Sequence, residues 1–232
     1  MNVAIIPARS GSKRIPGKNI KSFAGKSIIS YSIAAAKITG LFDRIIVSTN
    51  SNQIAEIARQ YGAEVPFRRP SNLSDDNIDI APVVEHAINW LNSKGQRVKY
   101  FCNIYPTAPF IRPDDLRDAF SILRDKKAAE VFSVTTFPFP VFRALRVAQN
   151  GHLEMFWPEN ELKRSQDLEE AYQDAGQFYW FDSEAFLKNK KNWDPGALPF
   201  FIPRYLVQDI DTPEDWQRAE LMFEVCRQKG LL

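Results

Sequence analysis

The sequence is poor in the residue types that build disulfide frameworks and metal clusters. Its 232 residues include two cysteines, two histidines and three methionines. Cys102 and Cys226 lie far apart in apolar stretches, which excludes a disulfide framework and a zinc cluster and favours reduced thiols. No stretch approaches the ~18 apolar residues of a membrane span, and residues 1–8 are too short and too uncharged for a signal peptide. These absences predict a cytoplasmic protein without a membrane partner.

An excess of charge of either sign is also missing. Lys and Arg number 30 against 28 Asp and Glu, and this balance disfavours nucleic acid as a partner. The first 42 residues are the exception, because they hold seven cations and no carboxylate. Six of these cations fall between Arg9 and Lys26, beside Gly11 and Gly17, whose backbone can approach a ligand closely. The sequence therefore predicts a site for a multiply charged anion such as a triphosphate; the alternative is a solvated basic loop.

Strand and helix patterns alternate along most of the chain. Buried strands are expected at residues 3–7, 44–49, 63–67, 98–105 and 131–135. Amphipathic helices are expected between them, the first with Ser27 as N-cap and Gly40 as its stop. Such alternation predicts a single α/β domain over residues 1–232, a three-layer α/β/α sandwich around a mostly parallel, Rossmann-like sheet.

The alternation breaks between residues 137 and 175. Two prolines open this segment, and it contains an Asn150-Gly151 turn signal and a charged stretch. We interpret it as an arm inserted into the domain. Strands at 177–182 and 205–210 and a helix over 213–229 are then expected to complete the fold.

Common phosphate-binding and nucleophile motifs do not fit the basic loop. Gly11 and Gly17 enclose five residues, and Lys18 is followed by Asn19, so the spacing is not that of a Walker A loop. No glycine lies two residues from Gly11, which disfavours a dinucleotide fingerprint. A Gly-x-Ser-x-Gly elbow is also missing, so a serine hydrolase is disfavoured.

Two carboxylates near the end of the chain form a second candidate constellation. Asp209 and Asp211 are two apart on an expected extended segment, so both side chains point to one side and can share a divalent cation such as Mg²⁺. Helix capping is the alternative, but it accounts for residues 212–215 only. The basic loop and the acid pair together predict phosphoryl or nucleotidyl transfer.

A series of short motifs resembles one known family. These motifs are residues 6–14, Lys18-Asn19, residues 45–49, Arg69-Pro70, residues 73–75, 106–109 and 209–211. In this order they are similar to the CMP-sugar-acid synthetases, the cytidylyltransferases that activate sialic acid and its relatives. The resemblance spans essentially the whole chain. It implies a fold of the nucleotide-diphospho-sugar transferase type and transfer of CMP from CTP to a nine-carbon sugar acid, with Mg²⁺ as cofactor.

Other short sequence motifs favour one branch of that family. Residues 135–140, 172–177 and 178–181 are similar to the branch that acts on pseudaminic acid. Tyr105 stands where sialic acid enzymes tend to carry Gln, and Ala175 where they tend to carry Asn. Sialic, legionaminic and deoxy-octulosonic acid remain alternative acceptors. A noncatalytic nucleotide-sugar-binding protein is the alternative from another class, although retention of both Asp209 and Asp211 argues against it.

The resemblance also implies roles for individual residues. Lys18 would stabilise charge on the α-phosphate and pyrophosphate, Asp209 and Asp211 would bind Mg²⁺, and the arm would reach the neighbour's site in a homodimer. The implied nucleotide-binding residues are Arg9, Ser12, Lys13, Lys18, Asn19, Arg69 and Ser74, and the implied sugar-binding residues are Tyr105, Arg143, Arg164 and Gln177. Arg143 or Arg164 would grip the acceptor carboxylate, because a guanidinium can bind a carboxylate through two parallel hydrogen bonds.

Overall fold

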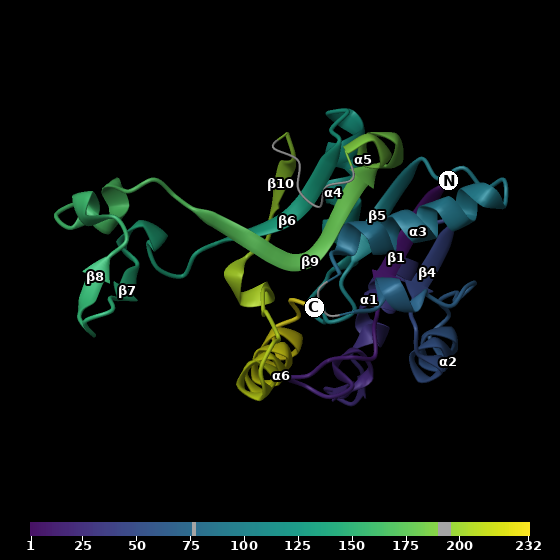
Figure 1. Ribbon diagram of the computed structural model, residues 1–232, viewed down its shortest axis with the longest axis horizontal. Coiled ribbons are helices and arrows are strands. Elements are labelled where there is room, and N and C mark those ends of the chain that lie inside the picture. Colours follow the sequence, from purple (N-terminus) through teal and green to yellow (C-terminus); the bar gives the residue numbers. More distant parts are fainter. Residues whose placement is uncertain (76–77, 190–195) are drawn as a thin grey trace.

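The computed structural model describes residues 1–75, 78–189 and 196–232. Within these ranges a six-stranded sheet runs through the centre, helices flank it, and an arm projects from the body (Figure 1). The strand order is β10-β6-β9-β5-β1-β4. These strands are β1 (Asn2–Pro7), β4 (Arg44–Ser48), β5 (Tyr100–Ile104), β6 (Glu130–Thr136), β9 (Tyr172–Asp182) and β10 (Leu198–Phe201).

The sheet is mostly parallel, as expected. β1 pairs in parallel with β4 and β5, and β10 pairs in parallel with β6. β9 is the exception, since it lies antiparallel between β5 and β6. Central strands of such a sheet consist of unbroken apolar runs, because helices cover both faces of the sheet. Residues 3–6 of β1 are accordingly completely buried.

Helices cover the sheet on both faces. One layer consists of α1 (Ile29–Thr39), α2 (Asn52–Gln60), α4 (Pro113–Asp125) and α6 (Pro213–Gln228), and the other of α3 (Ile80–Ser93) and α5 (Ser183–Asn189). β9 contributes side chains to the hydrophobic cores on both faces of the sheet. Phe178 and Trp180 lie on one face, and Tyr179 and Phe181 lie on the other. The expected three-layer sandwich is thus confirmed. Among the described residues, no helix has the length and apolarity to cross a bilayer.

Helix ends follow their local sequence signals with one exception. Thr212 caps α6 by a capping box with Asp215, and Gly40 ends α1 in the left-handed conformation at φ 67°. The predicted N-cap of α1 is wrong. Ile28 occupies that position with helical dihedrals, and the Ser27 hydroxyl donates instead to the Ile20 carbonyl at 3.2 Å. Ser27 does not cap the helix because it pairs with Ser22 in the short hairpin of β2 (Ser22–Phe23) and β3 (Lys26–Ser27).

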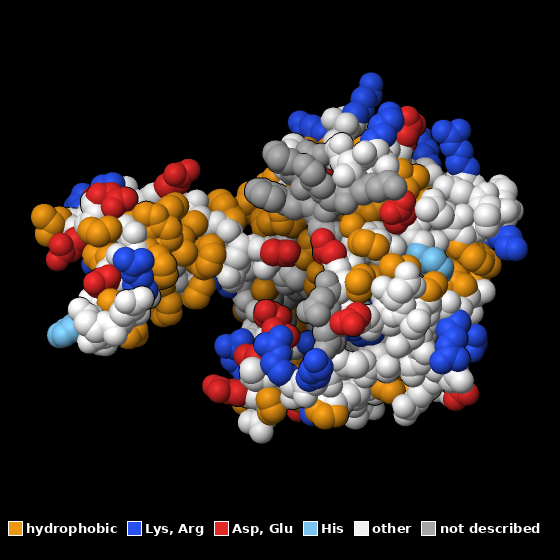
Figure 2. Space-filling model, viewed as in Figure 1, with side chains coloured by type: hydrophobic (Ala, Val, Ile, Leu, Met, Phe, Trp, Pro, Cys, Tyr) orange, Lys and Arg blue, Asp and Glu red, His pale blue; other side chains and the backbone are white. Residues whose placement is uncertain are grey.

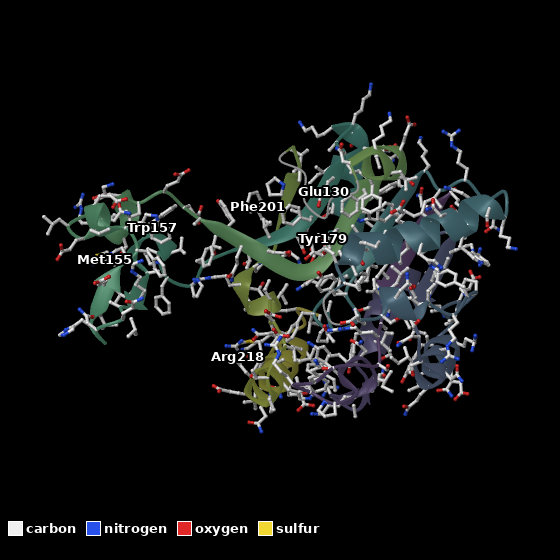
Figure 3. The ribbon with its side chains drawn as sticks, viewed as in Figure 1. Glu130, Met155, Trp157, Tyr179, Phe201 and Arg218 are labelled. Carbon is white, nitrogen blue, oxygen red and sulfur yellow. The ribbon has the colours of Figure 1, made fainter. Side chains whose placement is uncertain are left out.

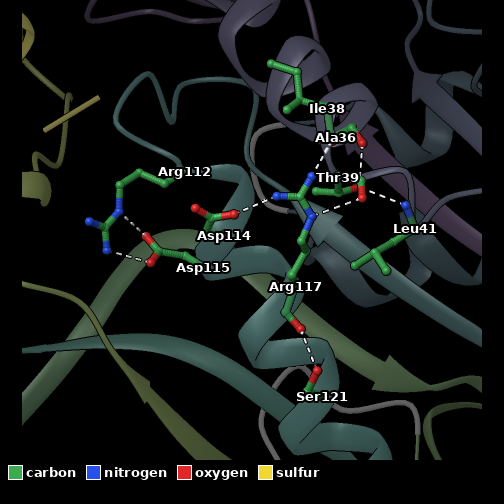
Figure 4. Close-up of polar contacts among 9 residues, drawn as sticks. All are labelled: Ala36, Ile38, Thr39, Leu41, Arg112, Asp114, Asp115, Arg117 and Ser121. Atoms are coloured by element: carbon green, nitrogen blue, oxygen red, sulfur yellow. Dashed lines mark hydrogen bonds and ion pairs between the residues drawn. The ribbon is translucent and has the colours of Figure 1, made fainter. Parts of the chain in front are cut away.

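One arginine ties α4 to the end of α1. The Arg117 guanidinium donates to the carbonyls of Thr39 at 3.1 Å and Ile38 at 2.5 Å, and it also pairs with Asp114 (Figure 4). Carbonyls in the last turn of a helix have no partner within the helix. Arg117 therefore satisfies two of them and fixes how the helices of this layer pack.

Two expected strands are wrong. Residues 63–67 make only an isolated bridge, between Glu64 and Ile46. Residues 205–210 are not a strand either, since Arg204–Leu206 form a short 3-10 helix and the next residues are irregular. The edge strand of that part of the sheet is β10, which the sequence patterns did not predict.

The arm lies between β6 and β9. It contains the two-stranded ribbon of β7 (Leu145–Val147) and β8 (Leu153–Met155), and the expected Asn150-Gly151 turn joins these strands. Residues 172–175, which were assigned to the arm, belong to β9. Hydrophobic side chains cover much of the visible arm surface (Figure 2). Its most exposed apolar residues include Leu162 at 95% and Phe139 at 81% exposure.

Candidate active site

A pocket of about 780 Å³ opens at the carboxyl ends of the central parallel strands. Pro7, at the end of β1, and Tyr105, just after β5, both line it. Ligands bind at this edge in open α/β sheets. The predicted site residues that line this pocket are Arg9, Ser12, Lys13, Lys18, Asn19, Arg69, Tyr105 and Asp211.

The basic loop after β1 holds its lysine at the pocket wall. Gly17 adopts φ 64°, a left-handed conformation that starts the short 3-10 turn of Lys18–Ile20. Asn19 is 8% exposed and donates to the Arg9 carbonyl at 2.8 Å. Asn19 thereby fixes the loop segment that carries Arg9.

The two constellations meet although they lie at opposite ends of the sequence. The Lys18 Nζ donates to the Ile210 carbonyl at 2.7 Å and to Asp211 Oδ1 at 3.2 Å. Arg14, which was not among the predicted site residues, donates to Asp211 Oδ2 at 2.8 Å. Asp211 is therefore paired with two cations of the basic loop.

Asp209 and Asp211 line two adjoining pockets. Asp211 borders the 780 Å³ pocket, and Asp209 borders a second one of about 510 Å³. Partial burial raises the pKa of the Asp209 carboxyl, and the nearby Asp211 raises it further, whereas Lys18 lowers it. The two carboxylates thus interact, but the segment between them is irregular rather than a strand.

Hard oxygen ligands of this kind fit a divalent cation that takes its other ligands from a substrate. Mg²⁺ is commonly held by one or two carboxylates together with phosphate oxygens. In residues 1–75, 78–189 and 196–232, no cluster of three or more His, Cys, Asp or Glu forms a metal site. The described residues thus offer these two carboxylates, and not a larger ligand cluster, beside the first pocket and the adjoining one.

Arg69 is a buried cation aimed at the first pocket. Only 4% of the residue is exposed, and its Nε and Nη2 atoms lack hydrogen-bond partners. Burial and the nearby Arg9 lower the pKa of the Arg69 guanidinium to about 10. A buried guanidinium without partners is costly to maintain in the unliganded protein. It is well suited to donate to an oxygen atom of an anionic ligand.

Replacement of Arg69 by methionine should weaken binding of CTP, the nucleotide that the family resemblance implies, by roughly ten- to a hundredfold, because hydrogen bonds from a charged donor would be lost. The same change should preserve or raise the melting temperature, since it removes a buried charge that Arg9 repels. Calorimetric titration with CTP and thermal unfolding would measure the two effects. Arg68→Met, at the exposed neighbouring position, is the matched control. Unchanged CTP affinity in Arg69→Met would contradict this role.

The second pocket combines hydroxyl groups with charges of both signs. Tyr179 on β9 and Arg218 on α6 bound it from the sheet and from the helix layer (Figure 3). The polar and charged lining residues are Tyr105, Thr107, Thr135, Thr136, Gln173, Asp174, Tyr179, Arg204, Gln208, Asp209 and Arg218. Sequence reasoning missed both Arg204 and Arg218, because no motif marks them. The pocket has the polarity expected for a polyhydroxylated acid.

Four predicted site residues line neither pocket. Ser74 donates to the Pro70 carbonyl and stabilises its own turn. Gln177 is buried and its amide donates to the Leu206 carbonyl at 2.6 Å, which holds the segment that leads to Asp209. Arg143 and Arg164 lie on the arm, and Arg164 pairs with Asp167.

Comparisons with known proteins agree with this geometry. The sequence profile described as Cytidylyltransferase matches residues 3–219. The chain belongs to the cytidylyltransferase family. It is therefore a nucleotidyltransferase, and the basic loop and acid pair lie within the matched region.

Two curated relatives of this cytidylyltransferase cover nearly its full length. Pseudaminic acid cytidylyltransferase of Campylobacter jejuni subsp. jejuni is 42% identical over 224 residues, 97% of each chain. CMP-N,N'-diacetyllegionaminic acid synthase of Legionella pneumophila subsp. pneumophila is 33% identical over 231 residues, 96% of each chain.

A solved structure of CMP:2-keto-3-deoxy-manno-octonic acid synthetase complexed with CTP has a similar fold. It aligns with a TM-score of 0.71 and 15% identity, over 96% of this chain and 98% of the other. The expected fold of the nucleotide-diphospho-sugar transferase type is thereby confirmed.

Proposed function

We propose that this cytidylyltransferase transfers CMP from CTP to the anomeric hydroxyl of a nonulosonic acid and releases pyrophosphate, with pseudaminic acid as the preferred acceptor. The contact of Lys18 with Asp211 carries the proposal, because it joins the basic loop to one member of the acid pair at the first pocket. The 42% identity with the Campylobacter enzyme supports the choice of acceptor.

The nucleotide is assigned to the first pocket. Arg9, Ser12 and Lys13 would bind the triphosphate, Asn19 would position Arg9, and Arg69 would donate to the nucleotide. Lys18 lies where it can stabilise the charge that develops on the α-phosphate and pyrophosphate. The loop thus aligns and neutralises the polyphosphate without covalent catalysis.

Asp209 and Asp211 would hold the divalent cation, for which we propose Mg²⁺. When bound, this ion would supply charge neutralisation at the phosphate oxygens. Lys18 and Arg14 both pair with Asp211 and line the first pocket, so the residue that would hold the cation lies beside two side chains that could bind the polyphosphate. Lys18 and Arg14 would thus contact the polyphosphate in the nucleotide-bound protein and Asp211 in the free protein.

A panel of acceptors tests the proposed reaction. Pyrophosphate release would be measured with CTP, Mg²⁺ and, separately, pseudaminic, legionaminic, sialic and deoxy-octulosonic acid. We expect turnover to be fastest with pseudaminic acid. Faster turnover with another acid would correct the acceptor alone. No release with any acid, while CTP still binds, would favour the noncatalytic nucleotide-binding alternative.

We further propose that the arm binds a second copy of this chain and brings Arg143 and Arg164 toward the neighbour's acceptor pocket. The exposed apolar residues of the arm support this proposal, since exposed patches of this kind are typical of interfaces.

The double variant Phe139→Ser/Leu162→Ser should convert the dimer to monomers, because it removes the two most exposed apolar side chains of the arm. Light scattering coupled to gel filtration would measure the mass. Leu221→Ser on α6, where the leucine is 73% exposed, is the matched control and should remain dimeric. A wild-type protein with the mass of one chain would refute the proposal.

A further inference from the structure

The carboxylate of Asp174 lies between the two pockets, and the proposed reaction gives it no role. Asp174, on β9, lines both the nucleotide pocket and the second pocket. Three other residues share this position, namely Tyr105, Thr107 and Tyr179. Asp174 therefore lies at the boundary that a donor and an acceptor must share.

Hydrogen bonds from the protein fix the Asp174 carboxylate. The Tyr179 hydroxyl donates to Oδ2 at 2.6 Å, and the Gly176 amide donates to Oδ1 at 2.8 Å. The Tyr105 ring packs beside that of Tyr179, with ring centroids 5.4 Å apart, next to this network. A carboxylate oxygen can accept two hydrogen bonds, so each oxygen of Asp174 retains capacity for a ligand.

The backbone of β9 is shaped to present this side chain. The register with β6 shifts between Phe132 and Val134, where Phe132 pairs with Tyr179 and Val134 pairs with Asp174. Gly176 lies within this irregularity at φ 62°. Bulges of this kind redirect side chains and are common beside active sites. Here the bulge brings Asp174 and Tyr179, five residues apart, into direct contact.

The position of Asp174 relative to the cationic side chains indicates which substrate it serves. A carboxylate repels the phosphates of the nucleotide, and the cations Arg9, Lys13 and Lys18 line only the first pocket. Hydroxyl and amide N–H groups of the acceptor could donate to Asp174 from the second pocket. An ionised carboxylate accepts stronger hydrogen bonds than a neutral oxygen does.

We propose that Asp174, held by Tyr179, is a specificity-determining residue that accepts a hydrogen bond from a hydroxyl or amide N–H of the sugar acid. This inference rests on the proposed function. It assigns to Asp174 the acceptor side of the reaction and no part in nucleotide binding.

The test is Asp174→Asn, which keeps the shape of the side chain and removes its charge. We expect the KM for the preferred acceptor to rise by roughly ten- to a hundredfold, because a charge-assisted hydrogen bond is lost. The KM for CTP and the calorimetric affinity for CTP should stay unchanged. Tyr179→Phe should raise the acceptor KM in the same direction, and it provides a second measurement if Asp174→Asn folds poorly.

Tyr172→Phe is the matched control. Tyr172 is also on β9, and its hydroxyl donates to the Glu170 carboxylate at 2.6 Å, but Tyr172 lines neither pocket. This variant should keep wild-type KM values for both substrates. An unchanged acceptor KM in Asp174→Asn and Tyr179→Phe, or an equal rise in the CTP KM, would overturn the inference. A wild-type enzyme that releases no pyrophosphate with any acceptor would instead overturn the proposed function.

Discussion

Replacement of Lys18 by methionine should lower kcat by about a hundred- to a thousandfold, the loss typical when one preorganised donor to a developing charge is removed. Lys18 Nζ reaches both the Ile210 carbonyl and Asp211 from the wall of the nucleotide pocket, and its side chain is 20% exposed. No other described lysine contacts the acid pair in this way. Steady-state pyrophosphate release would measure the change in kcat.

Lys26→Met is the control for the Lys18 variant. Lys26 belongs to the same basic segment, but it lies in β3 and outside both pockets. This variant should retain wild-type kcat. If Lys18→Met instead raised the KM for CTP at unchanged kcat, Lys18 would act in binding alone.

Asp211→Asn should reduce turnover by about a thousandfold, since a carboxylate that would hold the cation is lost and transition-state stabilisation of several kcal/mol is removed with it. Folding should remain intact. The Asp211 side chain is 37% exposed, and its ion pair with Arg14 lies at the surface, where such pairs contribute little to stability. An asparagine can still accept a hydrogen bond from the half-buried Lys18. Pyrophosphate release across a Mg²⁺ titration would measure turnover, and thermal unfolding would measure stability.

The matched control is Asp125→Asn, which also removes a carboxylate paired with an arginine at the surface. Asp125 pairs with Arg124 at the end of α4, outside both substrate pockets. Its turnover and Mg²⁺ dependence should match those of the wild type. Near-normal turnover in Asp211→Asn would refute a role of Asp211 in holding the cation.

The sequence patterns predicted elements whose signals are local. The apolar run of β1 and the helix cap at residues 212–215 lie where expected. These features depend on neighbours within a few residues along the chain. The expected basic pocket also follows locally, because the end of a central parallel strand faces the ligand edge of the sheet.

The patterns failed where long-range contacts decide the outcome. No strand was predicted at residues 198–201. β10 forms there in spite of Pro199, because it is an edge strand with β6 as its neighbour and a missing donor is tolerated. The apolar run at 205–210 has no strand partner, because the Gln177 side chain binds its Leu206 carbonyl. Residues 63–67 bridge β4 only at Glu64, since Pro66 cannot continue a ladder.

The candidate site divides in the same way. The residue types of the basic loop and acid pair indicated an anion site and a cation site from composition and spacing alone. Which of their members touch could not be predicted, because Lys18 and Asp211 are 193 residues apart. Arg14 and Asp174 fall within quoted motifs, but nothing in those motifs indicates which residues their side chains contact, and no motif marks Arg218.

Local order along the chain thus accounts for the strands, the helix caps and the chemical character of both constellations. Packing of the sheet and its helices accounts for everything that joins them, including the contacts of Asp211 and the network around Asp174. The physical reason is that hydrophobic patterns specify which face of an element is buried, whereas the neighbours of a side chain depend on the register and order of strands that are distant in sequence.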